Sequence, residues 1–353
     1  MQKAITELCT NLSASFSMSQ HRLDFSAWFI LGLISTKTVN LTQIALALNP
    51  DVRSASNYRR IQRFLAEFSF DKQALARWVL EQLPDEALLL CLDRTNWKLG
   101  ALNINIMALG VAYRGTAFGV MWSLLAKFGN SNQQERINLM KCLFKVLPKS
   151  RIKALVADRE FIGQDWFAFL IDQGITFHIR LRQNMLAEFG GTEKHLHLFF
   201  SRLAVGQSLT LRQPQCIGQH KLWVTGLKLE GDELLIIVTN GNPKNSLSFY
   251  AQRWEIEMLF SALKTTGFDL EATHLNKLTR IDTLLVLVML AAVWAHKVGE
   301  RLHKDVKPIS VKKHGRKAQS YFRYGLDHLR CTLLHLHAKL KDFFWCLQAL
   351  SCT

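Results

Sequence analysis

The sequence predicts an α/β protein: a mixed β-sheet core with helices on its faces, a β-rich insertion, and helical regions at both ends of the chain. Three observations predict this fold. Apolar residues recur at the three- and four-residue spacing of helices over residues 20–83. From residue 86 onward, short apolar runs and amphipathic stretches follow in the order β-β-β-α-β-α-β. Residues 186–247 are strand-like and punctuated by glycine, and helical patterns resume at residue 248.

The composition describes a globular protein with a strongly basic surface. The 353 residues include 44 Lys and Arg against 28 Asp and Glu, a formal net charge of +16, and 49% are hydrophobic. A disordered polycation is excluded, because disorder combines high charge with low apolar content. A folded chain with this charge is expected to bind a polyanion, either nucleic acid or an anionic membrane surface.

The sequence favours nucleic acid over a membrane. The longest apolar stretch, Thr283–Ala295, is shorter than the roughly 20 residues that a spanning helix needs, so we expect a buried core helix. The N-terminus lacks the charged-then-apolar order of a signal peptide. The seven cysteines are scattered without a CxxC pair, which predicts reduced thiols and a cytoplasmic protein.

A helical pair near the N-terminus resembles a helix-turn-helix. Asn40 is placed to cap a short helix, and a second helix is expected over Ser54–Phe68. Its apolar side leaves Asn57, Arg60 and Arg63 on another face, which would enter a major groove and contact DNA. The turn is longer than usual, so an ordinary helical pair with a solvated basic face stays an open alternative.

The core elements follow from Glu86. The run Leu88–Leu92 is typical of a strand buried on both faces. Two strands, Ile104–Tyr113 and Thr116–Leu125, flank Arg114-Gly115 and predict a hairpin. Further along, the pattern predicts a helix over Asn132–Leu147, a strand over Ile152–Ala157, a helix over Gln164–Gln173 and a strand over Ile175–Leu181.

These elements divide the chain into five expected segments. They are an N-terminal helical DNA-binding domain (1–85), the first part of a catalytic core (86–187), a β-rich insertion (188–247), the second part of the core (248–300) and a basic C-terminal helical region (301–353). The last segment holds half of the net charge. Within it we expect a loop to contact DNA phosphates, although a solvated linker is the alternative; its basic residues are Lys307, Lys312, Lys313, Arg316 and Lys317.

Two aspartates follow predicted strands. Asp93 comes directly after Leu88–Leu92, and Asp158 comes directly after Ile152–Ala157. The carboxyl ends of strands are where open α/β sheets place their sites. Either residue alone is more often a turn or cap residue, so the pair needs further support.

The support comes from a helix predicted over residues 248–268. At 100° per residue, Tyr250, Arg253, Glu257 and Lys264 share a 60° sector, while apolar residues cover another side. An Arg–Glu pair on a solvated surface would explain part of this pattern. Together with the two aspartates, however, Glu257 suits a site holding two Mg²⁺ ions, or Mn²⁺ in their place, for phosphoryl transfer.

The spaced residues Tyr250, Arg253, Glu257 and Lys264 reproduce the YREK signature, and the chain therefore resembles a family of bacterial insertion-sequence DDE transposases. The contexts Cys91–Trp97 and Ala157–Phe161 are similar to the first two acidic blocks of that family. The resemblance implies a ribonuclease-H-like core split by the insertion, with Asp93, Asp158 and Glu257 as the metal-binding triad.

The resemblance also implies how such an enzyme acts. Members cut double-stranded DNA at the terminal inverted repeats, pass through a hairpin intermediate, join the 3′ ends to target DNA and act as homodimers. Tyr250, Arg253 and Lys264 would hold phosphates around the scissile and flipped nucleotides. A flipped base needs an aromatic partner, for which Trp254 and Trp223 are candidates, although packing in the core is the favoured role for each.

Two other functions remain open at this stage. One is a domesticated nuclease that nicks DNA without joining ends. The other is a catalytically silent DNA-binding protein derived from a transposase, against which the intact triad argues.

Overall fold

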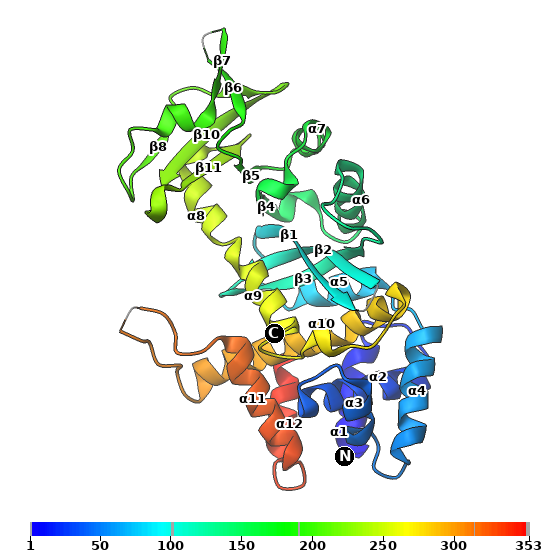
Figure 1. Cartoon of the computed structure of the whole chain (residues 1–353). Helices are drawn as coiled ribbons and strands as arrows, with labels where there is room; N and C mark the ends of the chain where they lie inside the picture. The colour runs from blue at the N-terminus through cyan, green and yellow to red at the C-terminus, as the bar shows by residue number, and fades with distance from the viewer. Residues whose placement is uncertain (1, 100–101, 190, 314, 351–353) are drawn as a thin grey trace. The chain divides into compact units, whose positions relative to one another are not determined.

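The computed structural model describes residues 2–99, 102–189, 191–313 and 315–350 (Figure 1). The chain forms two compact units, and each is described by itself. The first contains residues up to Pro84, Asn96–Ile104 and everything from Leu259 onward; the second contains Asp85–Thr95 and Asn105–Met258. Helices from the two ends of the chain thus pack into one unit.

The second unit is built on a mixed β-sheet. Within the described residues its neighbouring strands run β3-β2-β1-β4-β5-β11-β10-β9-β6-β7, with β8 beside β10. The strands are β1 (Leu88–Leu99), β2 (Leu102–Tyr113), β3 (Thr116–Leu124), β4 (Ile152–Ala157), β5 (Phe177–Leu181), β6 (Leu186–Phe189), β7 (Thr192–His195), β8 (Ser208–Thr210), β9 (Gln215–Ile217), β10 (His220–Lys228) and β11 (Leu234–Thr239).

The central strands match the sequence closely. β1 pairs with β4 and β4 with β5 in parallel, while β2 and β3 form the expected antiparallel hairpin. Its turn uses positive φ angles at Arg114 (51°) and Gly115 (91°), a conformation that suits tight two-residue hairpins. The prediction of a mixed α/β sheet is confirmed, and β4 has the bounds expected for it. β1 is longer than predicted, because its polar second half also pairs.

Helices cover both sides of this sheet. α6 (Gln133–Leu143) begins at a capping box made by Asn132 and Glu135. α7 (Gln164–Asp172) contacts α6, and α8 (Ser246–Ala251) packs against β4, β5 and β11. In Figure 1, β4 and β5 lie between α8 on one side and α6 and α7 on the other.

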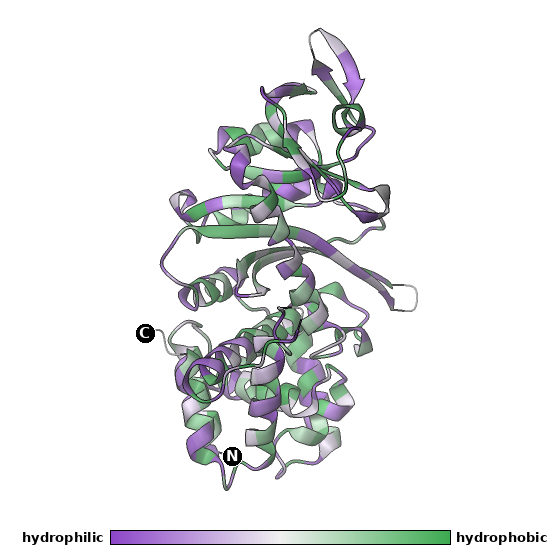
Figure 2. Cartoon of the chain, turned by 90° about the vertical axis from the view of Figure 1, so that its left-hand side faces the viewer, coloured by the Kyte–Doolittle hydropathy of each residue, from purple (hydrophilic) through white to green (hydrophobic). Residues whose placement is uncertain are grey.

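The β-rich insertion extends the core sheet. Its last strand, β11, pairs antiparallel with β5, and β10 pairs antiparallel with β11, β8 and β9. The β6–β7 hairpin is more polar than the central strands of the sheet, as the purple strands at the top of Figure 2 show. Every residue of β7 is exposed.

The first unit is helical. Its helices are α1 (Gln2–Ser13), α2 (Gln20–Thr36), α3 (Leu41–Ala47), α4 (Ser54–Glu67), α5 (Lys72–Glu81), α10 (Leu278–Asp305), α11 (Tyr321–Leu334) and α12 (Leu340–Leu347). α10 is long and apolar enough to span a membrane, but 78% of its most apolar window is buried inside the protein. The predicted core helix is therefore confirmed.

α10 and α11 cross at two glycines. A Cβ atom built on Gly299 would lie 1.8 Å from the Tyr321 carbonyl oxygen, and one on Gly325 would lie 1.8 Å from the Ala295 carbonyl oxygen. Real Cβ atoms do not approach backbone that closely, so any side chain here must push the helices apart. Only glycine permits this crossing.

We predict that Gly299→Ala lowers the free energy of unfolding by about 2 kcal/mol or more, because overpacking moves backbone rather than side-chain ends. Gly32→Ala is the matched control, since its added Cβ would meet side-chain atoms of Leu48 and Ile44 at 3.1 and 3.3 Å, and the backbone carbonyl oxygen of Ile44 only at an ordinary contact distance of 3.7 Å. Denaturant midpoints measure both. Equal effects would show that the crossing tolerates a methyl group.

Candidate functional site

The two aspartates lie side by side. Leu92 of β1 pairs with Ala157 of β4 in parallel register, and Asp93 and Asp158 are the residues that follow this pair. Asp158 comes directly after β4 as predicted, whereas the prediction that Asp93 follows its strand is wrong, because β1 continues to Leu99 and Asp93 lies inside it. Neighbouring strands lie about 4.8 Å apart, so the two carboxylates start from adjacent points on the sheet. Both side chains are partly buried.

The helix that follows the insertion differs from its prediction. In place of one helix over residues 248–268, α8 ends at Ala251 and α9 (Trp254–Leu263) begins after a tight turn. Backbone N–H groups at Arg253 and Ile256 bond three residues back, to Tyr250 and Arg253, which tightens the chain there. No Gly or Pro causes this break.

Arg253 joins two of the three predicted acids. Its Nη1 donates to Asp93 Oδ2 at 3.0 Å, and its Nη2 donates to Glu257 Oε1 at 2.6 Å. The Arg253 side chain is only 15% exposed, and its buried Nε has no partner. Burial alone would lower the pKa of Arg253, but Tyr250, Asp93 and Glu257 outweigh this and raise it. Arg253 is thus a fixed positive charge between two carboxylates.

Tyr250 contacts the third acid. Its hydroxyl donates to Asp158 Oδ1 at 3.1 Å, and its ring lies 5.6 Å from the guanidinium carbon of Arg253. Burial raises the pKa of Tyr250 to about 12, with Asp158 adding to the shift and Arg253 opposing it. The phenol therefore stays protonated and acts as a donor. Tyr250 and Arg253 of the signature together reach Asp93, Asp158 and Glu257.

The electrostatics show that the acids share one site. Burial raises the pKa of Asp93 to about 6, against the Arg94 backbone N–H and the Arg253 charge; Asp158 and Glu257 repel it and raise the pKa further. Such carboxylates are the donors that Mg²⁺ prefers. Among the described residues, however, no three His, Cys, Asp or Glu side chains stand at metal-ligand spacing. The carboxylates are thus of the kind that binds a divalent cation. In this structure, however, Asp93 and Glu257 are spaced so that the Arg253 guanidinium fits between them.

Lys264, the last member of the signature, lies beyond the end of α9. Its ammonium pairs with Glu271 Oε1 at 2.9 Å, donates to the Asn96 carbonyl at 3.3 Å and lies 4.9 Å from the Trp97 ring centre. These residues all belong to the first compact unit, whereas the three acids belong to the second. The contact of Lys264 with the scissile phosphates stays a prediction.

The two tryptophans proposed for a flipped base differ in exposure. Trp254 follows Arg253 at the start of α9, and 59% of its surface is exposed. The interpretation of Trp254 as a packing residue was therefore wrong: the chain turns before it and leaves it in solvent. Trp223 lies on β10 and is half-buried.

Glu255 holds the start of α9 in place. Its carboxylate accepts hydrogen bonds from the backbone N–H groups of Gly115 and Tyr113, in the β2–β3 turn, and its Oε2 is buried without a partner. The sequence offered no sign of this role, because the hairpin turn and α9 are far apart along the chain. Glu255 thus connects the Arg253–Glu257 segment to the sheet.

The N-terminal helical pair has a different polar face from the expected one. Asn40 caps α3 as predicted, accepting from the N–H groups of Thr42 and Gln43. Asn57 is only 1% exposed, and its amide donates to the carbonyls of Ala45, Asn49 and Val52. Asn57 therefore fixes the turn between α3 and α4 and does not present its side chain to DNA.

The exposed basic side of α4 carries Arg59 and Arg63. Arg60 is half-buried, with its guanidinium 5.9 Å from the Phe25 ring centre. Beside α4 lies a polar cavity of about 210 Å³, which includes one arginine and one histidine. Its lining residues are Asn40, Leu41, Thr42, Tyr58, Gln62, His274, Leu275, Asn276 and Arg280.

The basic loop between α10 and α11 is anchored at its base. Ile309 is buried, and its backbone N–H donates to His303 Nδ1 at 2.8 Å. Val311 and Lys317 form a β-bridge. The predicted DNA-contacting side chains are exposed, although Lys317 also donates to the Tyr321 hydroxyl; they are Lys312, Lys313, Arg316 and Lys317.

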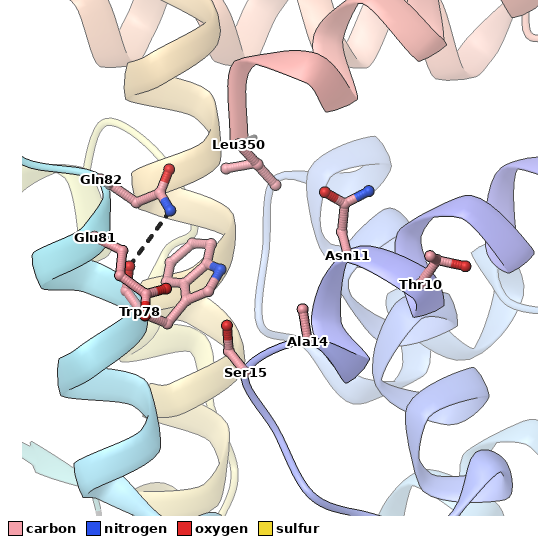
Figure 3. A pocket seen from close by; sticks show the side chains of 8 residues that line it. All are labelled: Thr10, Asn11, Ala14, Ser15, Trp78, Glu81, Gln82 and Leu350. Carbon is pink, nitrogen blue, oxygen red and sulfur yellow. Dashed lines mark hydrogen bonds between the residues drawn. The ribbon is translucent and has the colours of Figure 1, made fainter. Parts of the chain in front are cut away.

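A second cavity, of about 280 Å³, lies between α1, α5 and the C-terminal turn (Figure 3). It is lined by Thr10, Asn11, Ala14, Ser15, Trp78, Glu81, Gln82 and Leu350. Its single charge is negative, so its chemistry does not suit a phosphate.

An ion pair next to the aspartates was not predicted from the sequence. Arg94 follows Asp93, and Glu160 lies two residues after Asp158; their side chains meet at 2.7 Å. Both residues stand in the motifs quoted above, but only the pairing of β1 with β4 brings them together.

Carboxylates gathered on neighbouring strands of a mixed sheet, on a strongly basic protein, are typical of the class of nucleic-acid phosphoryl-transfer enzymes. The particular family is also clear: the chain belongs to the transposase DDE domain family, which matches residues 86–294, more than half of its length. No curated protein matches the chain. Membership makes it a transposase and implies DNA as its substrate.

The anchoring of α9 generates a pH prediction. Burial raises the pKa of Glu255 from 4.5 to about 7, so the folded protein binds this proton more tightly than the unfolded chain. The stabilisation is complete below about pH 4.5 and is lost as the pH rises through about 7. Glu255→Gln should therefore become more stable relative to wild type between pH 5 and pH 8, by at most about 3 kcal/mol.

Urea unfolding across this pH range measures the difference between the two proteins. Asp172→Asn, at an exposed position of α7, controls for the loss of one negative charge. A Glu255→Gln curve parallel to the wild-type curve would contradict the buried, proton-binding carboxylate.

Proposed function

We propose that the protein is the DNA transposase of an insertion sequence, of the YREK group, which cleaves the transposon ends and joins them to target DNA through a hairpin intermediate. Asp93, Asp158 and Glu257 are its catalytic acids. The observation that carries the proposal is the contact of Tyr250 and Arg253 with all three of these acids. Tyr250 and Arg253 are also two members of the spaced signature, which supports this assignment.

The three acids would hold two Mg²⁺ ions, or Mn²⁺, which supply Lewis-acid activation of the attacking and leaving oxygens. The remaining roles belong to the chain. Arg253 offers two parallel N–H donors and an unpartnered Nε, which suit a DNA phosphate once the guanidinium leaves the carboxylates. Tyr250 orients Asp158 through its hydroxyl.

Exposed Trp254 is proposed to stack on a flipped base. Base–aromatic stacking contributes about 1–3 kcal/mol and needs an accessible ring face, which Trp254 has and Trp223 largely lacks. Its position beside Arg253 places phosphate and base contacts on consecutive residues.

Binding of the terminal inverted repeats is proposed for two basic surfaces. One is the exposed side of α4 with Arg59 and Arg63, flanked by Arg60 and the polar cavity. The other is the loop with Lys312, Lys313, Arg316 and Lys317. The exposed cationic side chains of both surfaces suit the phosphate backbone of DNA.

The remaining parts of the proposal rest on the family resemblance. They are a ribonuclease-H-like core, a homodimer that pairs two transposon ends, and action in the bacterial cytoplasm. Acids on neighbouring parallel strands of a mixed sheet support the first of these.

We predict that Asp93→Ala, Asp158→Ala or Glu257→Ala abolishes strand cleavage of a terminal-repeat duplex while end binding survives, because the acids act on metal ions and not on the duplex. Cleavage is followed on labelled DNA with Mg²⁺, and binding by gel shift without it. Asp172→Ala is the control. Full cleavage by any of the three variants would remove the triad assignment.

The nuclease alternative is separated by a joining assay. Precut ends with free 3′ hydroxyls and a target plasmid should give joined product with the wild-type protein. Cleavage of intact ends without any joined product would favour a nuclease, and metal-independent binding without cleavage would favour a silent DNA-binding protein.

Substitutions at Arg253 and in the basic loop should have different effects on cleavage and on DNA affinity. Arg253→Ala is expected to slow cleavage on the order of 10²-fold with little loss of end affinity, as for other transition-state donors. Replacing Lys312 and Lys313 by Ala should instead weaken binding and reduce the slope of log affinity against log salt by about 2. If Arg253→Ala lost only affinity, this division of roles would be wrong.

A further inference from the structure

The segments that follow the two catalytic aspartates are tied to each other by a two-point ion pair. Arg94 Nε donates to Glu160 Oε1 at 2.7 Å, and Arg94 Nη2 donates to Glu160 Oε2 at 3.0 Å. The side chains are only 13% and 18% exposed. A partly buried, bidentate pair fixes direction as well as distance, which an exposed pair does not.

Arg94 makes further contacts that hold its guanidinium in one plane. Nη1 donates to Asn105 Oδ1 at 3.1 Å, and Nη2 donates to Asn130 Oδ1 at 3.2 Å. Asn105 is fully buried, and its amide donates to the carbonyls of Lys127 and Gly129. Strands β1 and β2 and the loop after β3 are thus joined through one arginine.

The backbone of Glu160 is fixed separately. Arg136 of α6 is 4% exposed, and its Nη2 donates to the carbonyls of Glu160, at 2.9 Å, and Ser131, at 2.6 Å. Its Nη1 donates to the Ile162 carbonyl at 3.0 Å, and its guanidinium lies 5.2 Å from the Phe161 ring centre. The turn after Asp158 is therefore held from both its side-chain and its backbone atoms.

Arg94 touches the acid site through its backbone N–H, which donates to Asp93 Oδ1 at 2.7 Å. In the described part of the chain the side chains of Arg94 and Glu160 make no hydrogen bond or ion pair with Glu257 or Tyr250, and the pair neutralises itself. A partly buried pair of this kind has a desolvation cost, and hydrophobic residues often replace such pairs without loss of stability. Stability alone therefore accounts poorly for this ion pair. Control of the positions of Asp93 and Asp158 does account for it, because Arg94 lies one residue after Asp93 and Glu160 lies two residues after Asp158.

We propose that Arg94 and Glu160 are positioning residues of the strand-cleavage reaction: their ion pair sets the separation of Asp93 and Asp158, and hence the metal affinity of the site. The proposal rests on the proposed function, since it assumes that the two aspartates bind the metal ions. Residues that orient metal ligands typically change metal affinity or activity 10- to 100-fold when replaced.

The test compares Arg94→Lys and Glu160→Gln with Arg151→Lys. Arg151 pairs with Asp85 at 3.6 Å, near the opposite ends of the same two strands, so it controls for loss of an Arg–carboxylate pair. Mn²⁺ binding is measured directly by calorimetry, with Asp93→Asn to identify the site. Cleavage of a terminal-repeat duplex is measured against Mg²⁺ concentration, and DNA-end affinity is measured without metal.

We expect Arg94→Lys and Glu160→Gln to weaken Mn²⁺ binding about 10-fold or more and to raise the Mg²⁺ concentration for half-maximal cleavage by a similar factor. DNA-end affinity should stay within about twofold, and excess Mg²⁺ should recover part of the cleavage by Glu160→Gln. The combined Arg94→Lys, Glu160→Gln variant should be no worse than the worse single change, because both changes remove the same interaction.

Mn²⁺ binding and Mg²⁺ dependence equal to those of Arg151→Lys would overturn the proposal. Loss of cleavage that no Mg²⁺ concentration recovers, with unchanged Mn²⁺ binding, would also overturn it, because positioning acts through the metal site. A wild-type protein that binds Mn²⁺ through Asp93 but cleaves no DNA would contradict the proposed function and leave the binding comparison intact.

Discussion

The bridge made by Arg253 is the interaction on which the rest of the site depends. Three carboxylates that share a half-buried region repel one another, and burial already raises the pKa of Asp93. A fixed cation between Asp93 and Glu257 offsets that repulsion within the chain itself. The tight turn before α9 places Arg253 where it reaches both Asp93 and Glu257. Glu255 holds the start of α9 through hydrogen bonds from the β2–β3 turn.

The Arg253 bridge also connects the two binding events of the proposed reaction, which are metal binding by the carboxylates and phosphate binding by Arg253. In the proposed reaction a divalent cation would neutralise the carboxylates in place of the guanidinium, and a DNA phosphate would accept the hydrogen bonds of Arg253. Binding of either ligand would then favour binding of the other, which is reciprocal coupling.

Much of this fold follows from local pattern. Strand β4, the β2–β3 hairpin and the Asn40 cap have short-range signals, namely apolar runs, a two-residue turn and a capping side chain. The strand-end position of Asp158 follows from the same runs, whereas Asp93 lies inside β1, which continues beyond the apolar run to Leu99. The signature spacing added Tyr250, Arg253 and Glu257, which the folded chain brings to those aspartates.

The remaining features depend on contacts between distant segments. A helical wheel gives no break at Arg253, where the chain contacts Asp93 and, through Glu255, the hairpin turn. Asn57 looks exposed on the wheel, yet it is buried and donates to the carbonyls of Ala45 in α3 and of Asn49 and Val52 in the turn. Trp254 looks like a core residue by type, but the break turns it outward. Arg94 and Glu160 meet only because β1 and β4 are parallel and in register.

The most direct test of this account is a crystal structure with a terminal-repeat duplex and Mn²⁺, the metal being located by its anomalous scattering. The account predicts Mn²⁺ on Asp93, Asp158 and Glu257, with the Arg253 guanidinium moved from the carboxylates to a DNA phosphate. Mn²⁺ bound elsewhere, with Arg253 still bridging Asp93 and Glu257 in the complex, would contradict it.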